Sequence, residues 1–172
     1  MNLELFLLVA ILAIAVATDI LYGKIHNVLT IPAMACGLMY HVYVKGFEGF
    51  LFSFEGLLIG FGVLIFFYAF GMMGAGDVKL MAAIGSFLGP AGVFNAFLFT
   101  AFSGGVYALI VLALHGRLIN FLKHIFYTFK IFLMRGGLEL QQNERKPTPK
   151  LCYGIAIAVG TTLSIFSDLK IV

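Results

Sequence analysis

The chain has 172 residues, of which 62% are hydrophobic and only 11% are charged, and its formal net charge at pH 7 is +3. In soluble domains about a quarter of the residues are charged. A chain with a mean hydropathy of +1.05 cannot cover itself with polar surface in water. These values exclude an ordinary soluble domain. They favour a single membrane-embedded domain over residues 1–172.

Six apolar segments are candidates for membrane-spanning helices, which need about 20 mostly apolar residues. In chain order they are Leu3–Thr18, Val28–Val44, Phe50–Phe70, Val78–Leu88 with an extension toward Phe94, Val93–Leu114 and Leu151–Ser167. The fourth is short, and its Gly89-Pro90 pair marks an end, because proline disfavours helix in the preceding residue. The sequence predicts an all-α polytopic bundle of about six transmembrane helices. Five helices with a re-entrant fourth segment are the alternative.

Small residues one helical turn apart occur in the third and fourth segments, at Gly56 and Gly60 and at Gly85 and Gly89. Such pairs let helix backbones approach closely in membranes. We expect a tightly packed bundle near Asp77.

The distribution of basic residues predicts the orientation, because short loops rich in Lys and Arg stay in the cytoplasm. With the N-terminus outside, nine of the 11 Lys and Arg residues lie inside, and only Lys45 and Lys170 lie outside. We therefore expect a multi-pass protein of the cytoplasmic (inner) membrane.

Residues 115–135 have a different pattern, in which large apolar side chains recur at helical spacing and basic ones fall largely on the opposite side. This pattern is typical of a helix that lies on the membrane surface. We expect a cytoplasmic amphipathic helix that anchors the chain or, alternatively, helps to hold a substrate. Residues 136–150 predict a solvated cytoplasmic loop.

Two acidic residues lie at the edges of predicted spans: Asp19 ends the first helix and Asp77 opens the fourth. The predicted topology brings both to the cytoplasmic face. Carboxylates at membrane depth are costly and tend to face a bundle interior or a wet cavity. Two facing carboxylates share a proton, so that one is poised as a base and the other as an acid, the arrangement that activates water in aspartic proteases. Asp19 and Asp77 are therefore a candidate catalytic pair.

Structural and transport roles for the same residues stay open at this point. Asp77 can cap the fourth helix, Asp19 can pair with Lys24, and both can relay ions or protons. The four histidines are scattered rather than spaced as metal ligands, so we expect no metal site.

Three motifs occur in the order known from one family. Residues 74–80 read Gly-Ala-Gly-Asp-Val-Lys-Leu, residues 18–27 place Asp19 before Lys24 and Asn27, and residues 153–158 begin with a Tyr-Gly pair. Together they resemble the type IV prepilin peptidase family, membrane aspartic peptidases with a GxGD motif. The chain departs from the family at His26 and Cys152, where proline is usual.

The chain lacks the cysteine-rich cytoplasmic insert of the larger, bifunctional members. It looks like the minimal kind associated with tight-adherence (Tad, Flp) pili, and it is also similar to archaeal preflagellin peptidases. The resemblance implies peptidase activity and leaves N-methylation of the mature pilin open.

The resemblance further implies an endopeptidase that cleaves the basic leader from prepilin-like protein substrates at the cytoplasmic membrane face. Asp19 and Asp77 would act together on a water molecule, without metal or organic cofactor. The expected partners are these substrates and the lipid bilayer, and not a nucleic acid. Substrate-binding or supporting roles are expected for a further set: Gly74, Gly76, Lys79, Lys24 and Asn27.

Each supporting residue also has a simpler interpretation. Gly74 and Gly76 could let the backbone come close to an extended substrate, or they could simply form a flexible turn. Lys79 could orient a carboxylate, or it could simply extend to the lipid interface. Asn27 is also a natural N-cap. For the whole chain, an ion or proton transporter and a non-catalytic scaffold for pilus or secretion assembly are the alternatives to a peptidase.

Overall fold

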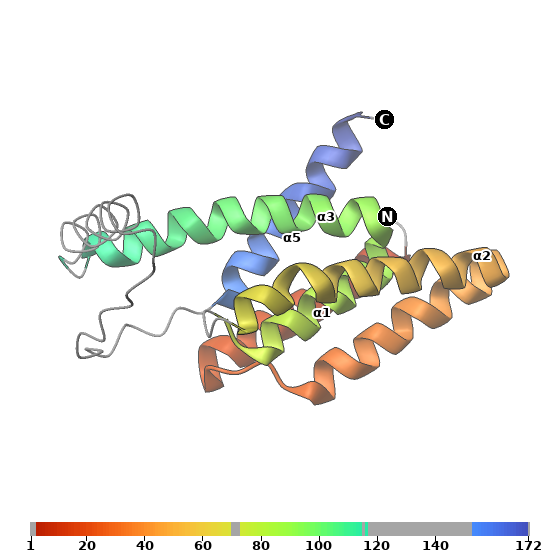
Figure 1. Cartoon of the computed structure of the whole chain (residues 1–172), viewed down its shortest axis with the longest axis horizontal. Helices are drawn as coiled ribbons and strands as arrows, with labels where there is room; N and C mark the ends of the chain where they lie inside the picture. The colour runs from red at the N-terminus through yellow and green to blue at the C-terminus, as the bar shows by residue number, and fades with distance from the viewer. Residues whose placement is uncertain (1–2, 70–72, 115, 117–152, 172) are drawn as a thin grey trace, which may run out of the picture. The chain divides into compact units, whose positions relative to one another are not determined.

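The computed structural model describes residues 3–69, 73–114, 116 and 153–171. The regular elements within this part are all helices and include no strand, which confirms the all-α prediction. With the labels of Figure 1, they are α1 (Leu3–Tyr22), α2 (Asn27–Ala69), α3 (Ala75–Leu114) and α5 (Tyr153–Ile171).

The chain divides into two compact units, one made of Met1–Gly104 and Cys152–Val172 and the other of Gly105–Leu151. All contacts described below belong to the first unit. Of the second unit, the structure describes the end of α3 and Gly116. The predicted amphipathic helix 115–135, apart from Gly116, and the predicted loop 136–150 lie outside the described residues.

Helices α1, α2 and α3 are each long and apolar enough to cross a membrane, and the part of α5 over Tyr153–Ser167 is a shorter apolar helix. The count of six spans is not confirmed, because α2 and α3 each run through two predicted segments and have 43 and 40 residues. Each of these helices contains one non-helical residue, Gly46 with φ 59° and Gly89 with φ 69°. Glycine adopts this left-handed region without the steric cost that a side chain would add.

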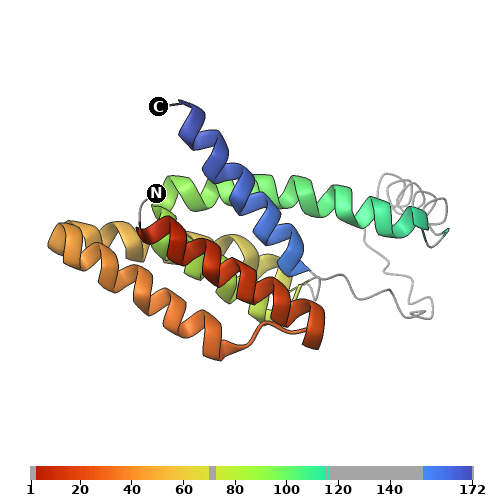
Figure 2. The same ribbon diagram turned by 180° about the vertical axis from the view of Figure 1, so that it is seen from behind.

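At Gly46 the chain reverses direction. The ring centroids of His41 and Phe52 are 5.1 Å apart, although an unbroken helix would separate these residues by about 16 Å along its axis. A Cβ atom on Gly49 would collide with the backbone carbonyl of His41. Helix α2 therefore folds back on itself, and α3 folds back likewise at Gly89, as both ribbon views show (Figures 1 and 2).

The glycine pairs lie where the second half of α2 crosses the first half of α3. A Cβ atom on Gly56 would collide with the carbonyl oxygen of Gly85, and one on Gly85 with that of Gly56. Next to this crossing, the buried Ser53 hydroxyl donates a hydrogen bond of 2.6 Å to the carbonyl of Ser86. The predicted close packing of the two segments is confirmed.

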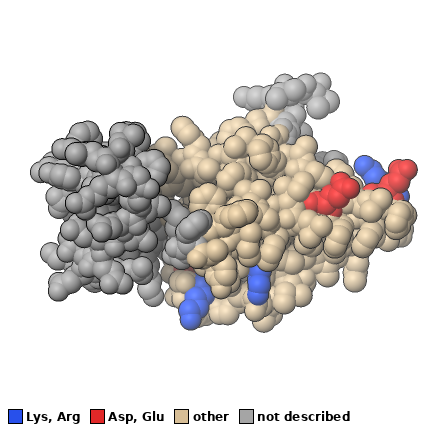
Figure 3. Space-filling view, in the orientation of Figure 1, with Lys and Arg blue, Asp and Glu red and all other residues tan. Residues whose placement is uncertain are grey.

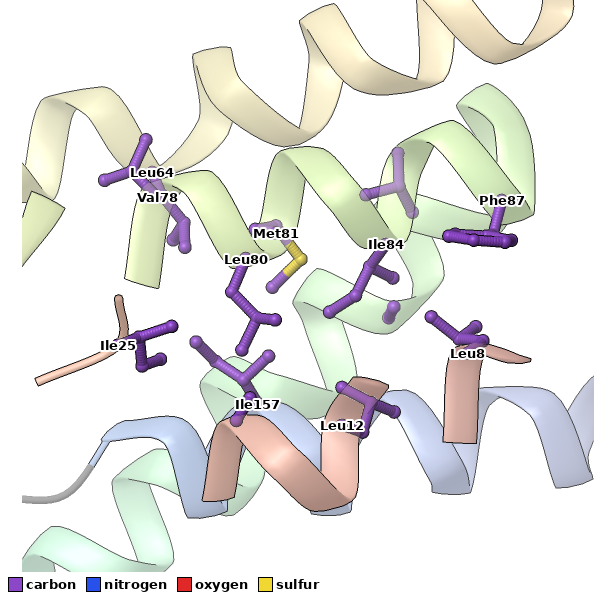
Figure 4. Packing of buried hydrophobic residues seen from close by; sticks show 13 residues of the cluster. Leu8, Leu12, Ile25, Leu64, Val78, Leu80, Met81, Ile84, Phe87 and Ile157 are labelled. Atoms are coloured by element: carbon purple, nitrogen blue, oxygen red, sulfur yellow. The ribbon is translucent and has the colours of Figure 1, made fainter. Parts of the chain in front are cut away.

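The first half of α3 is the centre of this unit, since every residue from 80 to 87 is buried. A helix that is apolar all round is typical of such a position. Figure 4 shows Leu80 and Ile84 pointing toward Leu12 of α1 and Ile157 of α5. The helix that begins at the GxGD motif is thus packed on several sides by other helices.

The outer faces of the helices carry large apolar side chains. Phe6, Phe66 and Phe102 are 57%, 68% and 73% exposed, and Figure 3 shows that most of the described surface in that view is uncharged. Apolar surface on this scale marks a membrane or protein contact. Together with the three long apolar helices, it indicates a multi-pass membrane protein.

Candidate active site

Asp19 lies in the last turn of α1. The helix ends at Tyr22, and the backbone N–H of Gly23 donates a hydrogen bond of 2.8 Å to the carbonyl of Asp19, a common way to end a helix. The Asp19 residue is 7% exposed. Its Oδ2 atom accepts a hydrogen bond of 2.9 Å from the backbone N–H of Gly154, in the first turn of α5.

Asp77 lies in the first turn of α3 and is 8% exposed. Its Oδ2 atom accepts a hydrogen bond of 3.0 Å from the N–H of Gly74, and its own N–H donates to the carbonyl of Gly74 at 3.1 Å. This is the carboxylate half of a capping box, in which the third helical residue reaches back to the cap. The capping interpretation therefore holds in part, with Gly74 and not Asp77 at the cap position.

The two carboxylates lie in the same part of the unit although they are remote in the sequence. Asp19 lies close enough to Asp77 to act on it electrostatically. The hydrogen bonds above engage only the Oδ2 atom of each.

Gly76 holds the segment between α1 and α2 against the start of α3. A Cβ atom on Gly76 would lie 2.8 Å from the carbonyl oxygen of Ile25 and 2.9 Å from its Cβ atom. Ile25 follows Asp19 by one helical turn and a bend, and Gly76 directly precedes Asp77. The backbone approach at Gly76 thus helps to set the spacing between the two aspartates.

Lys79 and Asn27 also come together, through a hydrogen bond of 2.8 Å from the Lys79 Nζ atom to the Asn27 Oδ1 atom on the exposed surface. His26 stands at the cap position of α2, because its carbonyl accepts hydrogen bonds from the N–H groups of Leu29 and Thr30. Asn27 is the first residue of the helix and not its cap, and its side chain binds Lys79.

Lys24 is the one predicted site residue for which the described part of the chain gives no partner. It is exposed, and no ion pair joins it to Asp19 within the described residues. Asp19 is instead bound by Gly154. The described residues thus show no ion pair between Asp19 and Lys24, which was the alternative to a catalytic role for Asp19.

Two residues at this end of the bundle were not among the candidates from the sequence. Gly154 binds Asp19, and Tyr153, which is partly buried, lies close enough to Asp77 for an electrostatic interaction with its hydroxyl group. The signal that could have identified them is the Tyr-Gly pair at the start of the last apolar segment.

Chemically, the site offers two buried carboxylates from separate chain segments, each held by one backbone N–H group and each with a second oxygen left over. Within the described residues, no three His, Cys, Asp or Glu side chains are grouped as metal ligands would be. Carboxyl groups are among the side chains that serve as general acids and bases.

Comparison with known protein families gives a match to the type IV leader peptidase family over residues 6–109. The matched region contains Asp19 and the whole GxGD motif and ends before α5. Curated proteins and solved structures gave no match. Because the family match covers more than half of the 172 residues, the chain belongs to the type IV leader peptidase family.

Proposed function

We propose that the protein is an aspartic endopeptidase of the cytoplasmic membrane that removes the basic leader from prepilin-like substrates. Family membership supports a protease. The observation that carries the aspartic assignment is that Asp19 and Asp77 are both buried and lie within electrostatic range of each other. Simultaneous ionisation of two neighbouring carboxylates is costly, and the proposed reaction uses the form in which one of the two is protonated.

In the proposed reaction, the ionised carboxylate takes a proton from water while the water oxygen attacks the carbonyl carbon of the scissile bond. The protonated carboxyl group gives its proton to the carbonyl oxygen. When the C–N bond breaks, the leaving nitrogen takes the proton held by the first carboxyl group, and the second carboxylate recovers one from the intermediate. The products are a carboxylic acid and an amine, and the pair returns to one shared proton. The proposal assigns the two roles to the pair and neither role to one residue.

We also propose six membrane-crossing segments: α1, the two halves of α2, the two halves of α3, and α5. Glu4 of α1 approaches His41 of α2 at 4.0 Å at one end, and Asp19, some 22 Å farther along α1 by helical rise, binds Gly154 at the other. The preference of basic loops for the cytoplasm places the aspartate end inside. A leader that is basic and cytoplasmic would then meet the carboxylates at the membrane surface.

The test uses the purified protein in detergent, incubated with a prepilin, and measures shortening of the substrate. Asp19→Asn and Asp77→Asn should each lower the cleavage rate by at least about 1,000-fold, as removal of catalytic groups does in other proteases. Glu48→Gln, which neutralises an exposed acid near the Gly46 reversal, is the matched control and should cleave normally. Cleavage retained by either Asn variant would remove the proposal. Ion flux into liposomes without cleavage would indicate a transporter, and neither activity would indicate a scaffold.

A further inference from the structure

The first turn of α5 contacts one of the two aspartates directly, and no step of the proposed reaction uses it. We infer that Gly154 is a positioning residue for Asp19, so that α5 completes the reaction site by fixing the direction of one carboxylate. The inference rests on the proposed role of Asp19 and goes beyond it, because it assigns a role to a segment outside the region matched by the family.

The hydrogen bond itself is the first observation. The N–H of Gly154 donates to Asp19 Oδ2 at 2.9 Å, and both residues are buried. In the first turn of a helix the N–H groups have no partner within the helix. A hydrogen bond to an ionised acceptor is stronger than one between neutral groups. Asp19 therefore satisfies an otherwise open donor, and the donor fixes its Oδ2 atom.

The space around Gly154 is the second observation. A Cβ atom at this position would lie 2.8 Å from Asp19 Oδ2, 3.1 Å from its Cβ and 3.2 Å from its Cγ. All three distances are shorter than ordinary van der Waals contacts. Only glycine lets the backbone of α5 come this close to the carboxylate, and any other residue would displace the carboxylate or the helix.

The packing of α5 is the third observation, because it keeps Gly154 in place. The Ser103 hydroxyl of α3 donates a hydrogen bond of 3.0 Å to the carbonyl of Ala156. A Cβ atom on Gly160 would collide with the backbone of Thr100, so these helices are also in close contact about one turn beyond Ala156. A slide by one residue would move the helix by 1.5 Å and turn it by about 100°. Helix α3 thus holds α5 in the register that points Gly154 at Asp19.

Loss of the hydrogen bond from Gly154 to Asp19 should affect the cleavage rate more than the affinity for substrate. With its Oδ2 atom fixed, Asp19 holds its Oδ1 atom in one direction for the water of the proposed reaction. Without the fixing bond the carboxylate can rotate, and a misplacement of about 1 Å at a reacting group can cost about 100-fold in rate. Gly154 acts through Asp19, so substrate affinity should change little.

The test compares Gly154→Ala with the control Gly104→Ala. At Gly104, which also lies where α3 contacts α5, an added Cβ atom would be 3.5 Å from the Cβ atom of Ala156, and this is an ordinary contact distance. The full-length purified variants are assayed for prepilin cleavage in detergent. We expect Gly154→Ala to lower kcat by about 10- to 100-fold with KM within about 2-fold of the unmodified protein. We expect Gly104→Ala to change neither value.

A second variant keeps the inference testable if Gly154→Ala does not accumulate. Ser103→Ala removes a hydrogen bond to α5 without adding bulk and should lower kcat by about 3-fold with KM unchanged. An unchanged kcat in Gly154→Ala would overturn the inference. If Gly154→Ala does not accumulate and Ser103→Ala does, an unchanged kcat in Ser103→Ala would overturn it. A raised KM with unchanged kcat would also overturn it, because Gly154 would then contact substrate. Failure of the peptidase proposal is distinct, since it would appear as cleavage by Asp19→Asn.

Discussion

The first unit has two ends at which polar side chains are buried, and they use these side chains differently. At the end near the Gly46 reversal, His41 is 5% exposed, and its Nε2 atom contacts the carbonyl oxygen of Phe87 at 2.9 Å. Phe87 lies just before the helix break at Gly89, where carbonyl groups lose their partners along the helix. His41 therefore satisfies a backbone group that the fold itself leaves open.

At the aspartate end, the direction of the hydrogen bonds is reversed. Backbone N–H groups of Gly74 and Gly154 donate to the carboxylates, and each carboxylate keeps an oxygen that no hydrogen bond within the described residues engages. The rings of Tyr40 and Phe52 pack edge-on against His41. Burial of a polar side chain is thus common to both ends, and what distinguishes the candidate site is that its buried groups are carboxylates held by backbone N–H groups of two separate chain segments.

The strongest way to test this contrast is Gly76→Ala at the aspartate end. The added Cβ atom would lie 2.8 Å from the backbone oxygen of Ile25, and backbone cannot move aside as a flexible side chain can. We expect the cleavage rate to fall by about 100-fold, because the spacing between Asp19 and Asp77 would change. The measurement is kcat for prepilin cleavage in detergent.

The matched control is Gly62→Ala in α2, where an added Cβ atom meets nothing within 4 Å. This variant should cleave at the normal rate. Equal rates for the two variants would show that the approach of Ile25 to Gly76 does not set the geometry of the site.

At the other end, His41→Ala should lower stability and leave the rate constant unchanged. The carbonyl of Phe87 would be buried without a donor, which costs about 1–3 kcal/mol. We expect a lower thermal midpoint in detergent and a kcat within about 2-fold of the unmodified protein. Val42→Ala, at a neighbouring exposed residue, serves as the control for loss of side-chain volume. A large loss of kcat without loss of stability would contradict the division between the two ends.

Sequence reasoning reached the aspartates because a carboxylate next to a long apolar segment is rare and its energetic cost is large. It also predicted an end at Gly89 and close packing at the glycine pairs of the third and fourth segments, since glycine and proline have strong local effects. These predictions depend on single residues and their near neighbours. For that reason they can be made without knowledge of the tertiary structure.

The contacts that the sequence did not reveal join distant segments through backbone groups. The bond from Gly154 to Asp19 uses an N–H that every residue except proline has, so no side chain marks it. His41 appeared only as one of four scattered histidines, because the carbonyl that it binds becomes open only when α3 breaks. The predicted count of about six spans is likewise not confirmed, because α2 and α3 each continue as helix on both sides of one glycine.

The smallest expected effect concerns Lys79, for which the sequence allowed either an interfacial or a functional role. Its hydrogen bond to Asn27 joins the start of α3 to the start of α2 on the exposed surface, where such a bond contributes about 1 kcal/mol or less. We expect Lys79→Met and Asn27→Ala to lower kcat for prepilin cleavage by less than about 5-fold and by similar amounts, because both remove the same bond. If Lys79→Met alone raised KM strongly, the ammonium group would contact substrate directly. Since the leader is basic, that contact would have to involve a carbonyl or acidic group beyond it, and the aspartate end would then bind substrate through side chains as well as cleave it.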